Sequence, residues 1–274
     1  THSLMAAPGC SHFLDTYSRL DRPRALRLLD KRGKLVRPVA SNEHPPVESY
    51  QLGHYERVSV KGSNGQSLQG MLLKPENFDA TRRYPVVVYT YGGPHAQVTR
   101  DAWGGRNELF HHYLASRGIL VFSLDNRGSA ARGRAFERAL LRRFGRAELE
   151  DQLAGVAWLR TQPFVAADRI GIWGWSYGGF MTTYAMTNAP DVFRAGAAVA
   201  PVTDWRLYDS IYTERYLKLP SDNPDGYRDS SPVTRADQLS GSLLLIHGTG
   251  DDNVHWQNTL AFVDRRYKAG KPYD

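Results

Sequence analysis

A serine between two glycines is the feature of this chain that most directly suggests chemistry. Ser176 lies in residues 174–179, between an apolar run that is expected to form a strand and residues 180–185, which are expected to form a helix. A strand, a tight turn carrying Gly-x-Ser-x-Gly and a helix make a nucleophile elbow, in which the serine hydroxyl is exposed at the helix N-terminus. The turn is strained, so only glycine-sized neighbours fit at Gly174 and Gly178. The pattern predicts that Ser176 is a catalytic nucleophile.

A nucleophilic serine needs two partners, because its hydroxyl is weakly reactive at neutral pH. A histidine acts as the base, and a carboxylate orients that histidine. In proteins with this elbow the acid follows a strand end and comes after the serine in the chain. The loop after the apolar run 243–246 carries Asp251 and Asp252, of which only one is expected to face a histidine. The same loop would also serve to cap the helix that follows it.

The histidine is harder to place. Only His247 and His255 follow Ser176, and each lies four residues from Asp251 in the same loop. A base that reaches both the acid and the serine is expected on a later loop, beyond one more helix and strand. We therefore expect His247 to be structural and the triad histidine to be absent from this chain.

The chemistry also requires donors for the oxyanion. The backbone N–H of Tyr177, the residue after the serine, would supply one donor, and a loop after an earlier strand would supply another. Residues 91–95, which follow the strand expected over residues 84–89, read Tyr-Gly-Gly-Pro-His. The glycines would keep the backbone close to the site while the Tyr91 hydroxyl reaches it. A glycine-rich turn without a catalytic part explains this segment equally well.

Composition excludes several other classes of protein. The chain has 274 residues, 41% hydrophobic and 23% charged, which suits one large globular α/β domain. No apolar run approaches the roughly 18 residues of a membrane span, and no signal peptide is visible. Cys10 is the only cysteine, so an intrachain disulfide is excluded.

The net charge of +7 does not come from a recognised nucleic-acid-binding motif. Four arginines recur at every fourth residue and would share one face of a single helix: Arg134, Arg138, Arg142 and Arg146. A solvated or domain-facing helix surface explains them better than nucleic-acid binding. We also expect neither a metal nor a cofactor. His111 and His112 are adjacent and so do not share a helix face.

The order of the expected elements predicts the fold class. Residues 55–61 and 66–73 read as a hairpin around the turn 62–65, and strands and helices alternate thereafter. This order predicts an α/β protein, an α/β-hydrolase fold with a mostly parallel sheet and helices on both faces. The expected strands are 84–89, 119–124, 170–173, 195–200 and 243–246, and the expected helices are 106–117, 148–161 and 256–269.

The first forty or so residues differ from the rest. Residues 13–17 and 24–29 read as strands, a polar turn follows at 31–33, and prolines among polar residues mark a linker over 38–46. Two strands are too few to bury a core, so their partners are expected upstream of residue 1. We therefore expect two domains, residues 1–45 and 46–274, the second incomplete at its C-terminal end.

Six short motifs, taken together, closely resemble the catalytic domain of the prolyl oligopeptidase family over roughly residues 50–274. In chain order they are Tyr91-Gly-Gly-Pro94, Asp125-Asn-Arg-Gly-Ser129, Gly174-Trp-Ser-Tyr-Gly-Gly179, Ala200-Pro-Val202 with Asp204-Trp205, Tyr212-Thr-Glu-Arg-Tyr216 and His247-Gly-Thr-Gly-Asp-Asp-Asn-Val254. The tryptophan of the elbow, the motif Tyr212-Thr-Glu-Arg-Tyr216 and the end of the last motif, Asp251-Asp-Asn-Val254, look specifically like the dipeptidyl peptidase IV branch.

The resemblance implies an activity and assigns roles to residues. It implies a serine peptidase that cleaves after a penultimate proline or alanine through an acyl-enzyme, with Ser176 as the nucleophile and Asp251 as the triad acid. Tyr91 and the Tyr177 N–H would be the oxyanion donors, and Asn253 would orient the substrate carbonyl. The pocket for the penultimate residue would be shaped by Val202, Trp205, Tyr208, Tyr212, Tyr216 and Val254. Proline is compact and apolar, so an aromatic box would select it by shape.

The resemblance also implies partners and leaves alternatives. Residues 1–45 would be the end of a β-propeller that gates the active site, together with its return linker. Paired glutamates on that propeller would hold the substrate's amino terminus. The family resemblance is compatible with a homodimer. It also favours a periplasmic or secreted location for the protein. The alternatives are an acylaminoacyl peptidase or oligopeptidase, a small-molecule esterase and an inactive binding module of the same fold.

Overall fold

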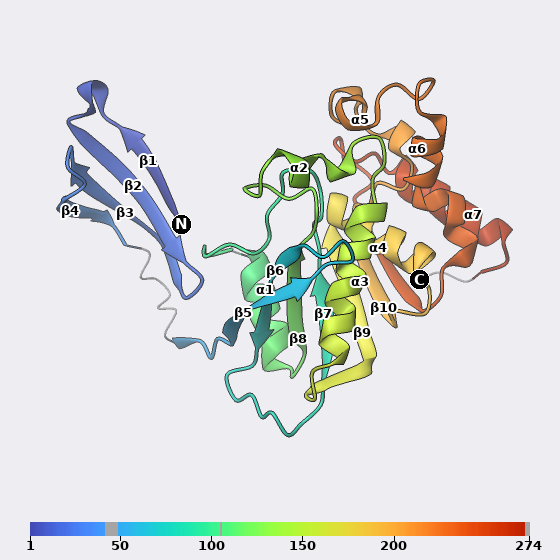
Figure 1. Ribbon diagram of the computed structural model, residues 1–274, viewed down its shortest axis with the longest axis horizontal. Helices are drawn as coiled ribbons and strands as arrows, with labels where there is room; N and C mark the ends of the chain where they lie inside the picture. The colour runs from blue at the N-terminus through green and yellow to red at the C-terminus, as the bar shows by residue number, and fades with distance from the viewer. Residues whose placement is uncertain (42–48, 105, 272–274) are drawn as a thin grey trace. The chain divides into compact units, whose positions relative to one another are not determined.

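The computed structural model describes residues 1–41, 49–104 and 106–271 (Figure 1). The chain divides into two compact units, one formed by residues 1–55, 73–78 and 100–118 and the other by the remaining residues. The predicted domain boundary near residue 45 and the predicted linker over residues 42–46 fall outside the described residues, whereas the linker's first residues, 38–40, belong to a strand. The assignment of two domains therefore stays a prediction.

The first unit contains a four-stranded antiparallel sheet in the order β1-β2-β3-β4. Its strands are β1 (His2–Ala6), β2 (His12–Arg19), β3 (Arg22–Asp30) and β4 (Leu35–Ala40). The sequence predicted only the two central strands. Pro38 was predicted to begin a linker but lies in β4, an edge strand, where proline is tolerated because alternate N–H groups point away from the sheet.

This sheet buries little apolar surface. Among the described residues 1–41, Leu29 is the only large apolar side chain that is buried, whereas Leu4 is 62% exposed and Met5 is 70% exposed. The expectation that these strands cannot bury a core alone agrees with that exposure. The helix α1 (Arg106–Ser116) also belongs to the first unit.

The larger sheet has seven strands in the order β11-β10-β9-β7-β8-β6-β5. The pairs β7–β8, β7–β9, β9–β10 and β10–β11 are parallel, which confirms the predicted mostly parallel sheet. The strands are β5 (His54–Lys61), β6 (Ser67–Lys74), β7 (Tyr84–Tyr89), β8 (Leu120–Asp125), β9 (Val165–Trp175), β10 (Ala195–Val199) and β11 (Ser242–Ile246).

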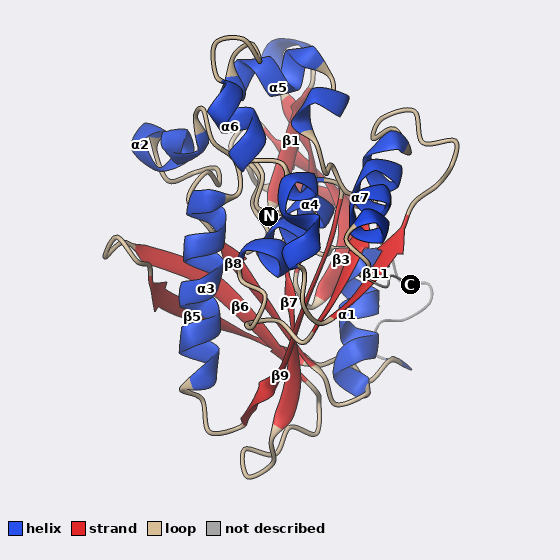
Figure 2. Ribbon diagram, turned by 90° about the vertical axis from the view of Figure 1, so that its right-hand side faces the viewer, coloured by secondary structure: helices blue, strands red, loops and turns tan. Residues whose placement is uncertain are grey.

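Two helices of the second unit, α3 (Arg146–Arg160) and α4 (Tyr177–Asn188), pack against β9 and lie over the same face of the sheet (Figure 2). The other helices are α2 (Arg134–Glu137), α5 (Ser210–Leu217), α6 (Pro224–Asp229) and α7 (Gln257–Lys268). The strand-to-helix step from β9 to α4 is therefore formed at the predicted place.

The helix α4 has almost no solvent-facing side, because every residue from Tyr177 to Thr187 is buried. A helix that is covered all round belongs to the core of its domain. Its threonine hydroxyls donate to carbonyls one turn earlier, Thr182 to Gly178 at 2.9 Å and Thr187 to Thr183 at 2.8 Å. These bonds satisfy the polar groups of a helix that is otherwise surrounded by protein.

The single arginine-bearing helix predicted over residues 134–146 is wrong. The helix α2 ends at Glu137, a short 3-10 turn follows, and Arg142 has a φ of 67°. Phe144, which is fully buried, places its ring 4.7 Å from that of Trp205. Burying this ring takes precedence over helix propensity, so the chain leaves the helical path before α3 begins.

Candidate active site

Ser176 occupies the turn between β9 and α4 with φ 59° and ψ −116°. A positive φ is unfavourable for a residue with a side chain and persists only where surrounding contacts enforce it. Here the Ser176 N–H donates to the carbonyl oxygen of Val199 at 2.9 Å, and the Ser176 carbonyl accepts from Phe180 N–H at 2.9 Å. The serine is thus fixed by the neighbouring strand β10 and by the first turn of α4.

The glycines around Ser176 are required by close packing against one carbonyl group. A Cβ atom at Gly174 would lie 2.4 Å from the Thr90 carbonyl oxygen, and one at Gly178 would lie 2.2 Å from the same atom. A Cβ at Gly179 would lie 2.6 Å from the carbonyl oxygen of Val199. Because backbone atoms form these contacts, only glycine fits at the three positions.

We predict that Gly178→Ala lowers the free energy of unfolding of residues 1–274 by about 3 kcal/mol or more, because neither backbone segment can move without disturbing the sheet. Urea denaturation followed by circular dichroism measures the change. Gly248→Ala is the matched control: no atom lies within 4 Å of a Cβ at that exposed position, so its effect should stay within about 0.5 kcal/mol. Equal stability of Gly178→Ala and the unmodified chain would contradict the packing argument.

Tyr91 follows the carboxyl end of β7, and its hydroxyl lies near the side chain of Ser176. Burial raises the pKa of Tyr91, and the interaction with the Ser176 side chain partly offsets the increase. The neutral phenol is therefore the form present at neutral pH, and it keeps a proton to donate. A Cβ at Gly93 would lie 2.9 Å from the Tyr177 ring, which explains the need for glycine beside Tyr91.

A buried carboxyl that sequence reasoning missed holds the side chain of Tyr177. Glu148 Oε1 accepts the Tyr177 hydroxyl at 2.7 Å and the Gly145 backbone N–H at 2.9 Å. Glu148 is fully buried, and its Oε2 has no partner among the described residues. Burial raises the pKa of Glu148 to about 7, and the nearby charge of Asp151 is a smaller cause in the same direction. The one signal in the sequence is its place in the first turn of a helix, where a carboxylate suits the free N–H groups.

Glu148 should make the stability of the chain depend on pH. Its pKa in the folded state lies near 7, above the ordinary value of 4.5. The folded state therefore binds this proton more tightly than the unfolded state. The resulting stability is complete below pH 4.5, and about 3 kcal/mol of it is lost as the pH rises through 7.

We predict that Glu148→Gln flattens the decrease in unfolding free energy between pH 5 and pH 7.5, because no proton is then exchanged at this position. Urea unfolding at several pH values measures the slope. Glu150→Gln serves as the control: the Arg127 and Arg146 hydrogen bonds and charges outweigh burial and lower the pKa of Glu150, so its contribution is lost only at acidic pH. An unchanged slope in Glu148→Gln would show that this carboxyl does not titrate in that range.

The candidate acid lies in the loop after β11. Asp251 Oδ1 accepts the backbone N–H groups of Asn253 and Val254, each at 3.0 Å. Asp252 is exposed. These bonds orient the Asp251 carboxylate through one oxygen and leave Oδ2 for another donor. The choice of Asp251 as the triad acid stays a prediction.

His247 braces the same loop. Its side chain is fully buried, Nε2 lies 2.7 Å from the Val254 carbonyl oxygen, and Nδ1 lies 2.7 Å from the Thr259 hydroxyl. Because a carbonyl only accepts, Nε2 carries the proton in this arrangement. His247 Nε2 lies 3.6 Å from Asp251 Oδ2. One ring nitrogen is occupied by the loop and the other by Thr259 on α7, so neither is available to Ser176, whereas His255 is exposed.

The predicted pocket tyrosines lie together in one aromatic cluster. The Trp205 ring stacks on Tyr212 with centroids 6.3 Å apart, and Tyr212 meets Tyr216 edge to face at 5.3 Å. Tyr208 packs edge to face on Tyr212 at 5.6 Å. Tyr208 precedes α5, which begins only at Ser210, and it has extended backbone angles.

The aromatic cluster reaches the acid loop and the candidate oxyanion tyrosine. The Tyr208 hydroxyl donates to Asn253 Oδ1 at 3.2 Å. Burial raises the pKa of Tyr212, with the neighbouring Tyr91 hydroxyl as the next cause. Val202 and Val254 are 2% and 1% exposed, so they support this region from beneath its surface.

The remaining family motif, residues 125–129, joins loops rather than entering the chemistry. Asp125 accepts the Val98 N–H at 2.7 Å, which anchors the segment that continues from Tyr91. Arg127 binds the fully buried Asp151 on α3 through two hydrogen bonds of 3.0 Å. These contacts fix the Tyr91 loop and α3, which carries Glu148.

Neither a metal site nor a membrane span is found in the part of the chain that the structure describes. No three His, Cys, Asp or Glu residues there come together as a metal would require. None of the described helices is both long enough and apolar enough to cross a bilayer.

The arrangement defines a class of protein. Tyr91, Ser176 and Asp251 follow the carboxyl ends of β7, β9 and β11, which lie at one edge of the parallel sheet. A strained serine in a strand-to-helix turn of such a sheet is the mark of the α/β-hydrolase fold, here of a serine hydrolase. Within that class, the sequence profile of the prolyl oligopeptidase family matches residues 109–274, and the chain belongs to this family.

Known relatives place the chain near the dipeptidyl peptidases. It is 36% identical over 289 residues to dipeptidyl peptidase 8 of Mus musculus and 35% identical over 287 residues to that of Homo sapiens, in each case over 100% of this chain and 32% of the relative. The crystal structure of Porphyromonas gingivalis dipeptidyl peptidase 4 superposes with a TM-score of 0.95 at 37% identity, covering 100% of this chain and 39% of that one. The resemblance inferred from the motifs is confirmed, and the chain spans about a third of the length of these curated relatives.

Proposed function

We propose that this chain is the catalytic part of a dipeptidyl-peptidase-like serine peptidase that cleaves peptides after a penultimate proline or alanine. The observation that carries the proposal is the strained backbone of Ser176 in the turn between β9 and α4, with the Tyr91 hydroxyl near its side chain. The costly backbone conformation of Ser176 presents its hydroxyl for attack. The neutral Tyr91 phenol beside it can donate to the oxyanion of a tetrahedral intermediate.

In the proposed mechanism, Ser176 Oγ attacks the scissile carbonyl carbon and a histidine accepts its proton. The Tyr91 hydroxyl and the Tyr177 N–H donate to the resulting oxyanion. The histidine then gives its proton to the leaving amine, and the acyl-enzyme forms. A water molecule releases the acid by the same sequence in reverse. Asp251, whose Oδ1 is held by backbone N–H groups, orients the histidine through Oδ2.

The histidine base is proposed to lie outside residues 1–274. Both ring nitrogens of His247 are occupied, and His255 is exposed in the same short loop. The edge strand β11 supports a continuation of the sheet, because its Leu244 and Ile246 are 50% and 48% exposed. A further strand beside β11 would cover these side chains and lead to a loop near the Asp251 carboxylate.

Substrate selection is assigned to the aromatic cluster. Trp205 and Tyr212 stack, and Tyr208 and Tyr216 pack on Tyr212. Such a cluster suits the side chain of proline, which is a compact apolar ring on a residue without an N–H. The exposed apolar side chains of the β1–β4 sheet, such as Leu4 and Met5, support the proposed β-propeller as the missing neighbour. On this proposal the propeller binds the substrate's amino terminus.

We predict that the full-length protein hydrolyses an Ala-Pro p-nitroanilide, whereas residues 1–274 alone show turnover barely above the uncatalysed rate. Loss of a triad member costs several powers of ten in rate. The release of nitroaniline measures both, and Ser176→Ala in the full-length protein is the control. Strong activity from residues 1–274 that Ser176→Ala abolishes would contradict the absence of a base.

We predict that Tyr91→Phe in the full-length protein lowers kcat by about a hundred-fold or more, because one oxyanion donor is lost while the ring remains. Tyr113→Phe is the matched control, since Tyr113 is 59% exposed and lies on α1. Steady-state kinetics separate kcat from KM. A change in KM alone would assign Tyr91 to substrate binding and not to the transition state.

The second candidate function is a small-molecule esterase, which shares the elbow and the oxyanion donors. The aromatic cluster favours the peptidase, because a simple acyl ester needs no proline-sized box. Faster hydrolysis of p-nitrophenyl acetate than of Ala-Pro p-nitroanilide by the full-length protein would favour the esterase. Failure to hydrolyse either substrate would favour an inactive binding module.

A further inference from the structure

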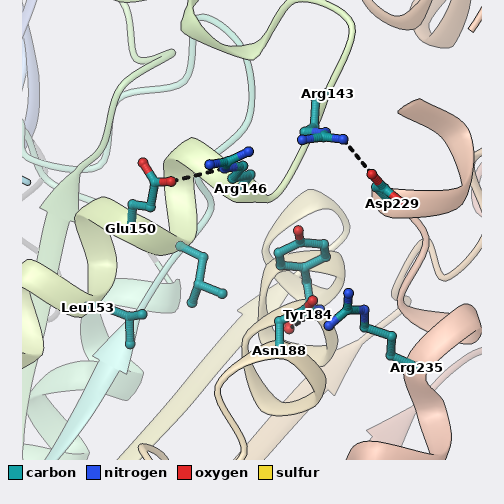
Figure 3. Close-up of a pocket in the computed structure, with 9 residues that line it drawn as sticks. Arg143, Arg146, Glu150, Leu153, Tyr184, Asn188, Asp229 and Arg235 are labelled. Carbon is teal, nitrogen blue, oxygen red and sulfur yellow. Dashed lines mark hydrogen bonds and ion pairs between the residues drawn. The ribbon is translucent and has the colours of Figure 1, made fainter. Parts of the chain in front are cut away.

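A cavity of about 300 Å³ lies among α3, α4, α6 and the 3-10 turn Pro232–Gln238, outside the residues assigned to catalysis (Figure 3). This volume is at the small end of the range of ligand pockets. Three arginines and two carboxylates lie in its wall: Arg143, Arg146, Arg235, Glu150 and Asp229. The net charge of the cavity depends on how these five side chains pair with one another and with their neighbours.

Each carboxylate in the wall is already shared by two arginines, which accounts for all four carboxylate oxygens. Glu150 accepts from Arg127 at 2.9 Å and from Arg146 at 3.1 Å, and Asp229 pairs with Arg143 and with Arg228, the latter at 2.9 Å. Charge-assisted hydrogen bonds of this kind are strong and compete with any new partner. The negative charge of both carboxylates is thus already shared with arginines other than the third arginine of the wall.

Arg235 is that third arginine, and none of the described Asp or Glu residues forms an ion pair with it. Figure 3 shows its guanidinium pointing toward Tyr184 and Asn188. Burial and the charge of Glu148 raise the pKa of Tyr184 to about 12, while the positive charges of Arg235 and Arg143 act in the opposite direction. Both guanidinium groups thus lie close enough to the phenol to act on its charge.

The rest of the cavity wall adds one free donor and an apolar surface. The Tyr184 ring is only 6% exposed, and its hydroxyl has no hydrogen-bond partner in the described part of the chain. Leu149 is 7% exposed, and Leu153 lies next to it in the same wall. The cavity therefore combines uncompensated positive charge, a phenol that can donate, and two aliphatic side chains.

We propose that this cavity binds a small organic carboxylate with a short aliphatic portion. Arg235 and the Tyr184 hydroxyl bind the carboxylate, as a planar guanidinium is suited to do, and Leu149 and Leu153 contact the aliphatic portion. Ligand pockets commonly have this composition, with apolar walls and a few polar groups that fix orientation. The site is independent of the proposed peptidase activity, since none of these residues is assigned to the reaction.

The test is calorimetric titration of residues 1–274, which requires no catalysis. Isovalerate is the probe, and its neutral amide, isovaleramide, is the matched ligand without charge. We expect saturable binding of isovalerate with a Kd in the millimolar range or tighter, and no saturable binding of the amide. Equal binding of the two, or no binding of isovalerate, would overturn the proposal.

Two variants locate the site. Arg235→Gln should weaken isovalerate binding at least tenfold, and Tyr184→Phe severalfold. Arg265→Gln, which removes the same charge from an exposed position on α7, should leave the affinity unchanged. Circular dichroism confirms that each variant is folded. An Arg235→Gln variant that binds isovalerate as well as the unmodified chain would place the binding elsewhere.

Inorganic phosphate tests the part played by the leucines. It presents a negative charge without an aliphatic portion, so it should bind more weakly than isovalerate. If phosphate binds as tightly as isovalerate, the aliphatic part of the proposal fails and the cavity is a general anion site. Because the readout is binding to residues 1–274, absence of peptidase activity in the full-length protein would leave this result unaffected.

Discussion

The geometry of the site depends on the close approach of the Thr90 backbone to the elbow. The Thr90 N–H donates to the Trp173 carbonyl at 3.1 Å, which extends the β7–β9 ladder by one residue. The Thr90 carbonyl then packs directly on Gly174 and Gly178. This contact fixes the position of the backbone directly after β7. Tyr91, the next residue in the chain, therefore lies beside the serine hydroxyl. Larger residues at either glycine would separate the two hydroxyls.

Two carboxyls serve the site in opposite electrostatic settings. Asp251 is partly exposed and its Oδ1 is held by two backbone N–H groups, so its orientation comes from the turn of its own loop. Glu148 is fully buried with one oxygen unpartnered among the described residues, and it favours the protonated form. Glu148 therefore suits a neutral brace for the Tyr177 side chain.

The sequence predicted those parts that local patterns determine. The elbow requires glycines at fixed positions, and the strand–helix alternation requires a parallel sheet, so both could be inferred from neighbouring residues. Contacts between distant segments could not. Nothing near Phe144 signals that it inserts beside Trp205 and interrupts a helix, and nothing near Glu148 identifies Tyr177 as its partner. The placement of Tyr208 before α5 likewise depends on tertiary packing.

The burial of α4 has a consequence for how this family diversifies. Because Ser176 directly precedes a helix without a solvent face, substitutions that shift the proposed nucleophile also disturb the core and so lower the stability of the fold. The segment 205–216 is different. It carries the tyrosines of the proposed pocket in and beside a short helix, with Ile211 76% exposed. Single substitutions there can therefore reshape the proposed pocket while the strained turn at Ser176 is left unchanged.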